Sequence, residues 1–229
     1  MVVERSREGQ GTAVLCSAGL DSAVLLAVEA RRGRVTPVYV SVGLAWEAAE
    51  RRALARLLAL PVFAGVEPAA VLAFDMRDIY PPTHWAIRGE PPAYDTPDED
   101  VYLAGRNLVL LTKAGVLCAQ RRLSRIALGP LAGNPFPDAT PAFFSAMARA
   151  MSLGLAHQVE VATPFVELEK EDVIRIGTEM GVPLDLTLSC MNPQGDRHCG
   201  ACSKCRERHD AFAAAGLADP TDYVLPAPR

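Results

Sequence analysis

Four of the six cysteines in this 229-residue chain lie within one short segment: Cys190, Cys199, Cys202 and Cys205. Two C-x-x-C steps share Cys202, so short turns can bring all four thiolates to one ion. Such a set is typical of tetrahedral zinc, and four protein ligands leave no open position for a substrate. We therefore predict a structural zinc site, with an iron–sulfur cluster or redox-active thiols as the alternatives. His198 is expected to be a neighbour of the site rather than a ligand.

A second candidate site is the segment SAGLDS at residues 17–22, which follows a short apolar run and precedes an apolar stretch with helical spacing. Small residues let backbone N–H groups approach an anion closely, and a helix N-terminus adds unpaired donors and the positive end of its dipole. Ser17 and Ser22 could add hydroxyl donors. The segment lacks the GxxxxGK[ST] pattern of a Walker loop. We predict a phosphate cradle, and the alternative is a glycine turn with Asp21 as the helix N-cap.

Strand and helix patterns alternate along the chain and must position these residues. We expect strands at residues 12–16, 35–42, 125–128 and 159–162, and helices at residues 21–31, 46–60, 106–121 and 169–180. This alternation indicates an α/β fold with a parallel twisted sheet and helices on both faces. Ligands bind such sheets at the carboxyl ends of the strands, which places the loops after Cys16, Val42 and Leu128 on the functional rim.

Two segments depart from this alternation. Residues 74–103 hold five prolines and a cluster of acids, and are expected to be either a functional lid or partly disordered. The cysteine segment is the other, so we expect an α/β domain at residues 1–185 and a small zinc-binding segment, packed on it, at residues 186–229.

The composition favours a globular enzyme that acts on small molecules. Half of the residues are hydrophobic and the formal net charge is −4, whereas proteins that wrap long nucleic acids usually carry a basic surplus. No segment reaches the roughly 18 apolar residues of a membrane span. Residues 1–11 lack the apolar core of a signal peptide. We therefore expect a cytoplasmic protein without disulfides, for which nucleic acid and membrane are unlikely partners.

The segment SAGLDS resembles the SGGxDS loop of the PP-loop ATP pyrophosphatases, which cleave ATP between the α- and β-phosphates and transfer AMP to a substrate oxygen. The resemblance implies that ATP and its Mg²⁺ are bound by the whole loop, that is, by Cys16, Ser17, Ala18, Gly19, Leu20, Asp21 and Ser22. The chain departs from that family at Ala18, where glycine is usual. The added methyl group is costly there if the φ angle is positive.

Longer motifs are similar to those of the 7-cyano-7-deazaguanine synthases, the QueC-type enzymes. They are AGRNLVLLTKAG at residues 104–115, FPDATPAF at 136–143, LEKEDVIRIGTEMGVPLDLTLSC at 168–190 and RHCGACSKCRERHDAF at 197–212. This resemblance implies ATP-dependent conversion of 7-carboxy-7-deazaguanine and ammonia to the nitrile through an adenylated intermediate. It also implies catalytic roles for Asp21, Ser22 and Arg106, substrate contacts at Arg106, Asn107 and Asp138, and a homodimer.

Three departures from the family pattern fall on the expected ligand rim, at residues 41–46, at residues 129–133 and at Thr140. They keep two alternatives open. The chain could be a divergent PP-loop enzyme that adenylates another carboxylic acid or a tRNA base. It could also be a zinc-stabilised nucleotide-binding module without catalysis.

Overall fold

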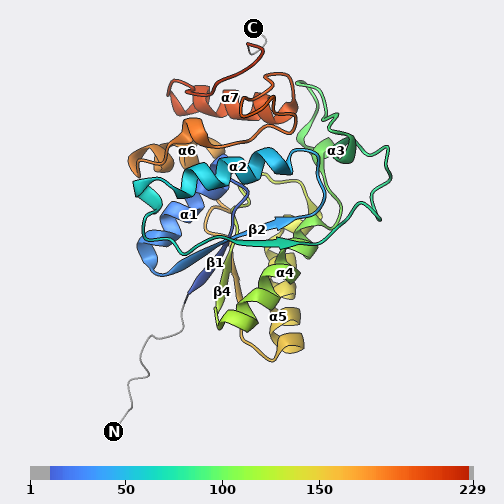
Figure 1. Ribbon diagram of the computed structural model, residues 1–229, viewed down its shortest axis with the longest axis vertical. Helices are drawn as coiled ribbons and strands as arrows, with labels where there is room; N and C mark the ends of the chain where they lie inside the picture. The colour runs from blue at the N-terminus through green and yellow to red at the C-terminus, as the bar shows by residue number, and fades with distance from the viewer. Residues whose placement is uncertain (1–10, 227–229) are drawn as a thin grey trace.

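A single sheet of five parallel strands forms the centre of the molecule in the computed structural model (Figure 1), which describes residues 11–226. Nearly all of the N-terminal segment considered above, residues 1–10, therefore lies outside the described residues. The strands are β1 (Thr12–Leu15), β2 (Val35–Ser41), β3 (Ala70–Ala73), β4 (Arg125–Ala127) and β5 (Glu160–Ala162). Their order is β3-β2-β1-β4-β5, and every neighbouring pair is parallel. The predicted α/β fold is thereby confirmed.

Helices cover both faces of the sheet. The helices α1 (Leu20–Arg32), α2 (Glu47–Leu58), α6 (Lys170–Glu179) and α7 (Ser203–Ala215) lie on one side, and α4 (Arg106–Arg121) and α5 (Pro141–Leu155) lie on the other (Figure 1). The interior strand β2 is buried along six of its seven residues, as expected for a parallel strand packed on both faces. The chain runs outward from β1 in both directions, so the gap between β1 and β4 is where such folds bind ligands.

Close packing brings α6 against α1. Gly177 of α6 is buried, and a Cβ atom added there would lie 2.7 Å from Cγ2 of Val24 and 3.0 Å from Cδ2 of Leu184. The absence of a side chain therefore lets the two helices approach, and it fixes the first residue of α6, Lys170, beside the start of α1. Gly181 follows this helix with a φ of 71°, the left-handed conformation that commonly ends a helix and that glycine adopts without strain.

Among the strands and the helices longer than four residues, three were not anticipated from the sequence: β3, α5 and α7. Strand β3 reads AVLA, a composition that suits a helix as well as a strand. The sequence does contain a helix-start pattern for α5, a threonine followed by a proline, since Thr140 is the N-cap and Pro141 the first residue of this helix. Thr140 thus serves the helix rather than a ligand, and it lines neither of the two cavities described below.

We expect Thr140→Ala to lower the free energy of unfolding by about 1 kcal/mol, the usual cost of losing an N-cap side chain. The Thr140 hydroxyl accepts a hydrogen bond from the Phe143 amide at 3.2 Å, and alanine leaves that donor without its partner. Urea unfolding measures the change. Thr140→Ser keeps the acceptor and serves as the matched control, so an equal loss in both variants would contradict the capping role.

The proline-rich segment at residues 74–103 contains the short helix α3 (Trp85–Arg88) and a 3₁₀ turn, Asp98–Val101. It packs on the cysteine segment, because the Ser203 amide donates to the Pro92 carbonyl at 3.3 Å and Arg206 contacts the Thr96 carbonyl at 3.0 Å. It also forms one wall of the larger of two adjoining cavities at the carboxyl ends of the strands. Its opening and closing as a lid stays a prediction.

The cysteine segment shares one buried hydrophobic cluster with α1, α2 and α6, to which Cys190, Cys199, Cys202, Cys205 and Phe212 contribute. Among residues 11–226, no helix combines the length and the apolar character that crossing a membrane requires.

Candidate active site and metal centre

Two adjoining cavities open at the carboxyl ends of the parallel strands. The larger has a volume of about 440 Å³ and is lined by the loop after β1, the loop after β4, the segment 74–103 and the first turns of α6 and α7. The smaller, of about 240 Å³, lies against β1, β2 and α4. Ser17, Glu50 and Arg106 line both. The topology thus brings the predicted loop to the expected edge of the sheet.

The loop at residues 17–22 leaves the N-terminus of α1 open. Gly19 is the N-cap and no side chain caps the helix. The Ser22 hydroxyl donates to the Gly19 carbonyl at 3.0 Å, and the Ser17 hydroxyl accepts from the Gly19 amide at 3.4 Å. Ser17, Gly19, Leu20 and Asp21 line the larger cavity, whereas Ser22 stabilises the loop from behind. The first-turn amides of α1 are therefore free to bind an anion.

A chain of charges runs from this loop to the cysteine segment. One carboxylate oxygen of Asp21 lies 3.2 Å from the Lys170 ammonium, and Glu207 forms ion pairs with both Lys170 and Lys204. Burial opposes ionisation of Glu207, but the two lysines lower its pKa to about 2. The other carboxylate oxygen of Asp21, Oδ1, is buried and has no hydrogen-bond partner in the described structure. An orphaned carboxylate oxygen beside an open helix N-terminus suits a magnesium ion with a bound phosphate.

Arg106 is the first residue of α4 and reaches into both cavities. Its Nε atom is buried without a hydrogen-bond partner, and no ion pair joins its guanidinium to a carboxylate among the described residues. A half-buried guanidinium whose Nε atom lacks a partner favours an anionic ligand, since removing a charge from water without a partner is costly.

Asn107 and Asp138, the other two predicted substrate contacts, hold each other. The Asn107 amide donates to Oδ2 of Asp138 at 3.1 Å, and the Asn107 side chain donates to the Asp138 carbonyl at 2.9 Å. Asn107 lines the smaller cavity, whereas Asp138 is buried and lines neither. Asp138 therefore sits behind the site, where its carboxylate caps the start of α4.

Several cavity residues have no counterpart in the sequence-based prediction. They are Tyr39, Trp46, Glu50, Trp85, Lys170, Lys204 and Glu207. Trp46 and Trp85 stack with ring centroids 5.8 Å apart and an interplanar angle of 8°, although they are 39 positions apart in the chain. Lys170 could have been predicted, since it follows the N-cap Glu169 and is the first residue of a helix that begins at the functional rim. Trp85, Lys204 and Glu207 reach the cavity through the fold of segment 74–103 and of α7. Tyr39, Trp46 and Glu50 reach it through the packing of α2 on β2.

Ala18 lies within the loop with a φ of 65° and is fully buried. Its carbonyl accepts a hydrogen bond from the Leu188 amide at 2.8 Å, which holds this backbone conformation in place. The methyl group is therefore in the costly conformation that the sequence analysis considered, because L-residues other than glycine are strained there.

Ala18→Gly is expected to raise the free energy of unfolding by about 1 kcal/mol through relief of that strain. Urea unfolding measures the gain. The control is Ala55→Gly, at an exposed position in α2, which should lower the free energy of unfolding by about 1 kcal/mol. Destabilisation of similar size in both variants would contradict strain at Ala18.

The four predicted zinc ligands converge. Their sulfur atoms all lie within 4.8 Å of one another, and the pairs 199–205, 190–202 and 202–205 are separated by 3.8, 4.0 and 3.5 Å. A tetrahedral site with Zn–S bonds of about 2.3 Å has sulfur–sulfur edges of about 3.8 Å. All four thiols are buried and none forms a disulfide. The residues therefore fit a structural zinc ion.

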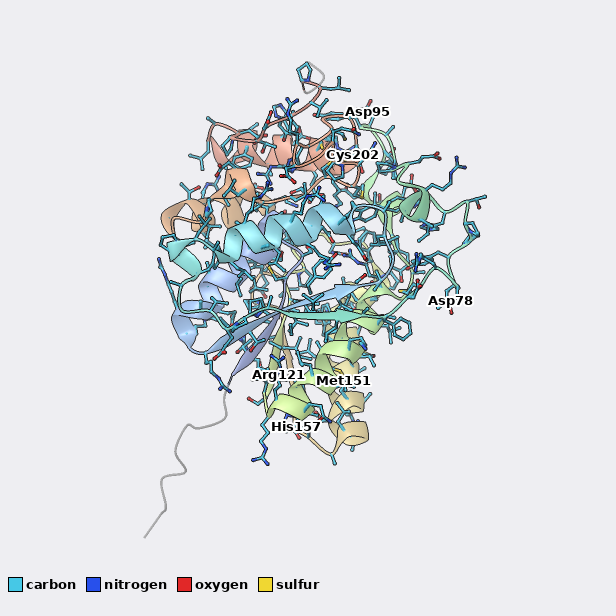
Figure 2. The ribbon with its side chains drawn as sticks, in the orientation of Figure 1. Asp78, Asp95, Arg121, Met151, His157 and Cys202 are labelled. Carbon is cyan, nitrogen blue, oxygen red and sulfur yellow. The ribbon has the colours of Figure 1, made fainter. Side chains whose placement is uncertain are left out.

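Backbone donors complete the cluster. Amides of Asn192 and Cys199 donate to the Cys190 sulfur at 3.3 and 3.2 Å, which suits a thiolate. His198 is outside the ligand set, because its Nε2 accepts a hydrogen bond from the Ser189 amide at 3.1 Å. Burial and the nearby Arg208 lower the pKa of His198 to about 3, so its ring is neutral at pH 7. Figure 2 shows Cys202 at the end of the molecule opposite to Arg121 and His157, close to Asp95 of the proline-rich segment.

Comparison with known proteins gives consistent matches along the chain. The family model described as queuosine biosynthesis protein QueC matches residues 12–216. The 7-cyano-7-deazaguanine synthase of Methanopyrus kandleri is 36% identical over 228 residues, covering 93% of this chain and 98% of the relative. The synthase of the same name from Methanothrix thermoacetophila is 34% identical over 222 residues, covering 91% and 96%. That of Anaeromyxobacter dehalogenans is 30% identical over 236 residues, covering 97% and 100%.

Proposed function

The chain belongs to the QueC family of queuosine biosynthesis proteins, and from this premise we propose that it converts 7-carboxy-7-deazaguanine and ammonia to 7-cyano-7-deazaguanine with ATP. It is an enzyme of the C–N ligase type, like the synthases that it matches over nearly their whole length. The observation that supports this reaction most strongly is the open N-terminus of α1, with its orphaned Asp21 oxygen, in the same cavity as the unpaired Arg106.

The reaction requires two activations. A carboxylate is a poor acyl donor because its leaving group would be oxide, so attack of its oxygen on the α-phosphorus of ATP first releases pyrophosphate and forms an acyl adenylate. Ammonia then attacks the acyl carbon, AMP leaves with the electrons of the C–O bond, and an amide remains. A second ATP adenylates the amide oxygen with release of pyrophosphate and one nitrogen proton, and loss of AMP and the other nitrogen proton gives the nitrile.

The two cavities divide the substrates in this proposal. The polyphosphate of ATP lies against the first-turn amides of α1, with Lys170 and Lys204 as counter-charges. The adenosine occupies the smaller cavity between β1, β2 and α4, where Val38 and Val40 line the wall. Asp21 would hold magnesium, which would supply positive charge against the phosphates.

The deazapurine acid takes the rest of the larger cavity. Arg106 binds its carboxylate, because this guanidinium lacks a partner and faces both cavities. The stacked rings of Trp46 and Trp85 provide a flat apolar wall for a planar heterocycle. Asn107 and Asp138 act as positioning residues that hold the first turn of α4, and with it Arg106.

The zinc ion has a structural role in this proposal, since four cysteines leave it no open position. Its segment nevertheless reaches the site, because Lys204 lies between Cys202 and Cys205 and lines the larger cavity. The homodimer and the cytoplasmic location implied by the resemblance stay predictions.

Assay of the purified protein tests the proposal directly. With Mg²⁺, ATP, ammonium and 7-carboxy-7-deazaguanine, mass spectrometry is expected to detect the nitrile, with two AMP and two pyrophosphate released for each nitrile formed. Pyrophosphate release with a different carboxylic acid, or with tRNA, and not with the deazapurine acid would reject this substrate. Nucleotide binding without turnover on any of them would reject catalysis.

A further inference from the structure

A buried carboxylate stands at the junction of the two cavities without a charged partner. Glu50, in α2, is 6% exposed and lines both cavities. One of its oxygens accepts a hydrogen bond from the Tyr39 hydroxyl at 2.8 Å. Burying a carboxylate without an ion pair is costly, so this position calls for an explanation in terms of a ligand.

Five carboxylates line the larger cavity, and the other four are already engaged. Each of the four forms an ion pair or caps a helix: Asp21 pairs with Lys170, Asp98 with Arg206, Glu207 with Lys170 and Lys204, and Glu169 belongs to the capping box of α6. Glu47 in the smaller cavity is also engaged, since it accepts from the Ser41 hydroxyl and from the amides of Val42 and Gly43. Among the described residues that line the two cavities, Glu50 is the carboxylate that neither pairs with a cation nor accepts a hydrogen bond from a backbone amide.

Arg106 lines the same two cavities, yet no ion pair joins it to Glu50. A cation and an anion that face one cavity without contact leave room for groups of the opposite charge between them. Arg106 suits the carboxylate to be activated, as proposed above. Glu50 suits the second substrate, which at neutral pH is the ammonium ion.

We infer that Glu50 is a catalytic residue that binds ammonium and accepts one of its protons, an inference that rests on the proposed function. The proton moves from nitrogen to a Glu50 oxygen, and the freed lone pair of ammonia forms the new C–N bond as AMP departs. The nitrogen loses its second proton to solvent as the amide forms, and Glu50 releases its own proton to solvent before the next cycle.

The surroundings of Glu50 support this role. Burial raises the pKa of the carboxyl group, against the opposing effects of Arg106 and the Tyr39 hydroxyl, which makes Glu50 a stronger base than a surface glutamate. Glu47, on the preceding turn of α2, acts in the same direction as burial. The groups that act on Glu50 from the elements around it are thus Glu47 of α2, the Tyr39 hydroxyl of β2 and Arg106 of α4.

Two half-reactions test this assignment separately from the proposed function. Exchange of labelled pyrophosphate into ATP, dependent on the deazapurine acid and run without ammonium, reports adenylation alone. If wild-type protein shows no exchange, the proposed function fails. For Glu50→Gln we expect exchange within about threefold of wild type and ammonium-dependent product lowered at least about 100-fold, the usual contribution of a general base. Glutamine still accepts from the Tyr39 hydroxyl, so the fold should persist.

Hydroxylamine provides the decisive comparison, because it is an uncharged nucleophile at neutral pH and needs no base to remove a proton first. Glu50→Gln is expected to form the acyl hydroxamate at close to the wild-type rate. The ammonium defect should shrink as the pH rises and more free ammonia is present. Tyr39→Phe should show a smaller loss of the same kind. A variant that retains the ammonium rate, or loses the hydroxylamine and ammonium rates equally, would overturn the assignment.

Discussion

Replacement of Asp21 by asparagine is expected to lower pyrophosphate release by at least about 1,000-fold, because it removes the charge that would hold magnesium against the phosphates. The substitution keeps the shape of the side chain. It changes the Oδ1 atom, which is buried in the larger cavity without a partner, and it weakens the contact with Lys170. Lys170 retains Glu207 as a partner, so the loss should fall on catalysis rather than on folding.

Three measurements separate these effects. Pyrophosphate release reports activity, thermal unfolding reports the fold, and metal analysis reports zinc. Asp78→Asn is the matched control, since Asp78 is exposed on the proline-rich segment, away from the cysteine cluster (Figure 2). An Asp21→Asn protein that unfolds or loses zinc would show that the residue is structural. One that keeps at least a tenth of wild-type activity would remove Asp21 from the nucleotide site.

The fold could be read largely from local patterns. The sheet has five strands of three to seven residues, and four of them were recognised because β-branched residues or flanking turns distinguish them from helices. The helix at residues 106–121 was predicted with its observed bounds, since Gly105 and the apolar spacing mark both ends. Strand β3 was not predicted because Ala70–Ala73 contains only one β-branched residue. Its pairing with β2 decides its conformation.

The candidate site divides in the same way. The loop at residues 17–22 and the four cysteines are contiguous, so their spacing alone indicates their chemistry. Glu50 gives no such signal, because a glutamate in an amphipathic helix is usually exposed. Its burial follows from the packing of α2 against β2, and only that packing brings it beside Tyr39 and Arg106. Residues that act through long-range contacts in this way are beyond a reading of local pattern.

The departures at residues 41–46 acquire a physical meaning in the folded chain. The lost polar groups are replaced by Leu44, which is buried, and Trp46, which stacks on Trp85. The wall of the larger cavity is therefore flat and apolar at this point. Ala18 is a different kind of departure, since it adds strain to the loop without adding a group that faces the cavity. Both leave the loop amides and Arg106 in place, which is consistent with a retained reaction.

Replacement of Cys202 by serine is expected to abolish zinc binding and lower the free energy of unfolding by more than about 4 kcal/mol. Cys202 is the shared ligand of two C-x-x-C steps, its sulfur lies 3.5 Å from that of Cys205 and 4.0 Å from that of Cys190, and its neighbour Ser203 is bonded to the proline-rich segment. Loss of the ion would leave the three remaining cysteines buried without a metal. It would also loosen the cysteine segment and the proline-rich segment that packs on it.

Cys118→Ser makes the same exchange of sulfur for oxygen at a buried cysteine of α4 that lies outside the cluster. It should keep one zinc ion per chain and cost at most about 2 kcal/mol, so the comparison isolates the metal from the burial of a hydroxyl. Metal analysis and urea unfolding of both variants measure this difference. If metal analysis of the wild-type protein finds iron and sulfide, the four cysteines hold an iron–sulfur cluster and not zinc. A zinc-free Cys202→Ser protein with wild-type stability would mean that packing on α1 and α6, and not the ion, holds Lys204 at the phosphate side of the cavity.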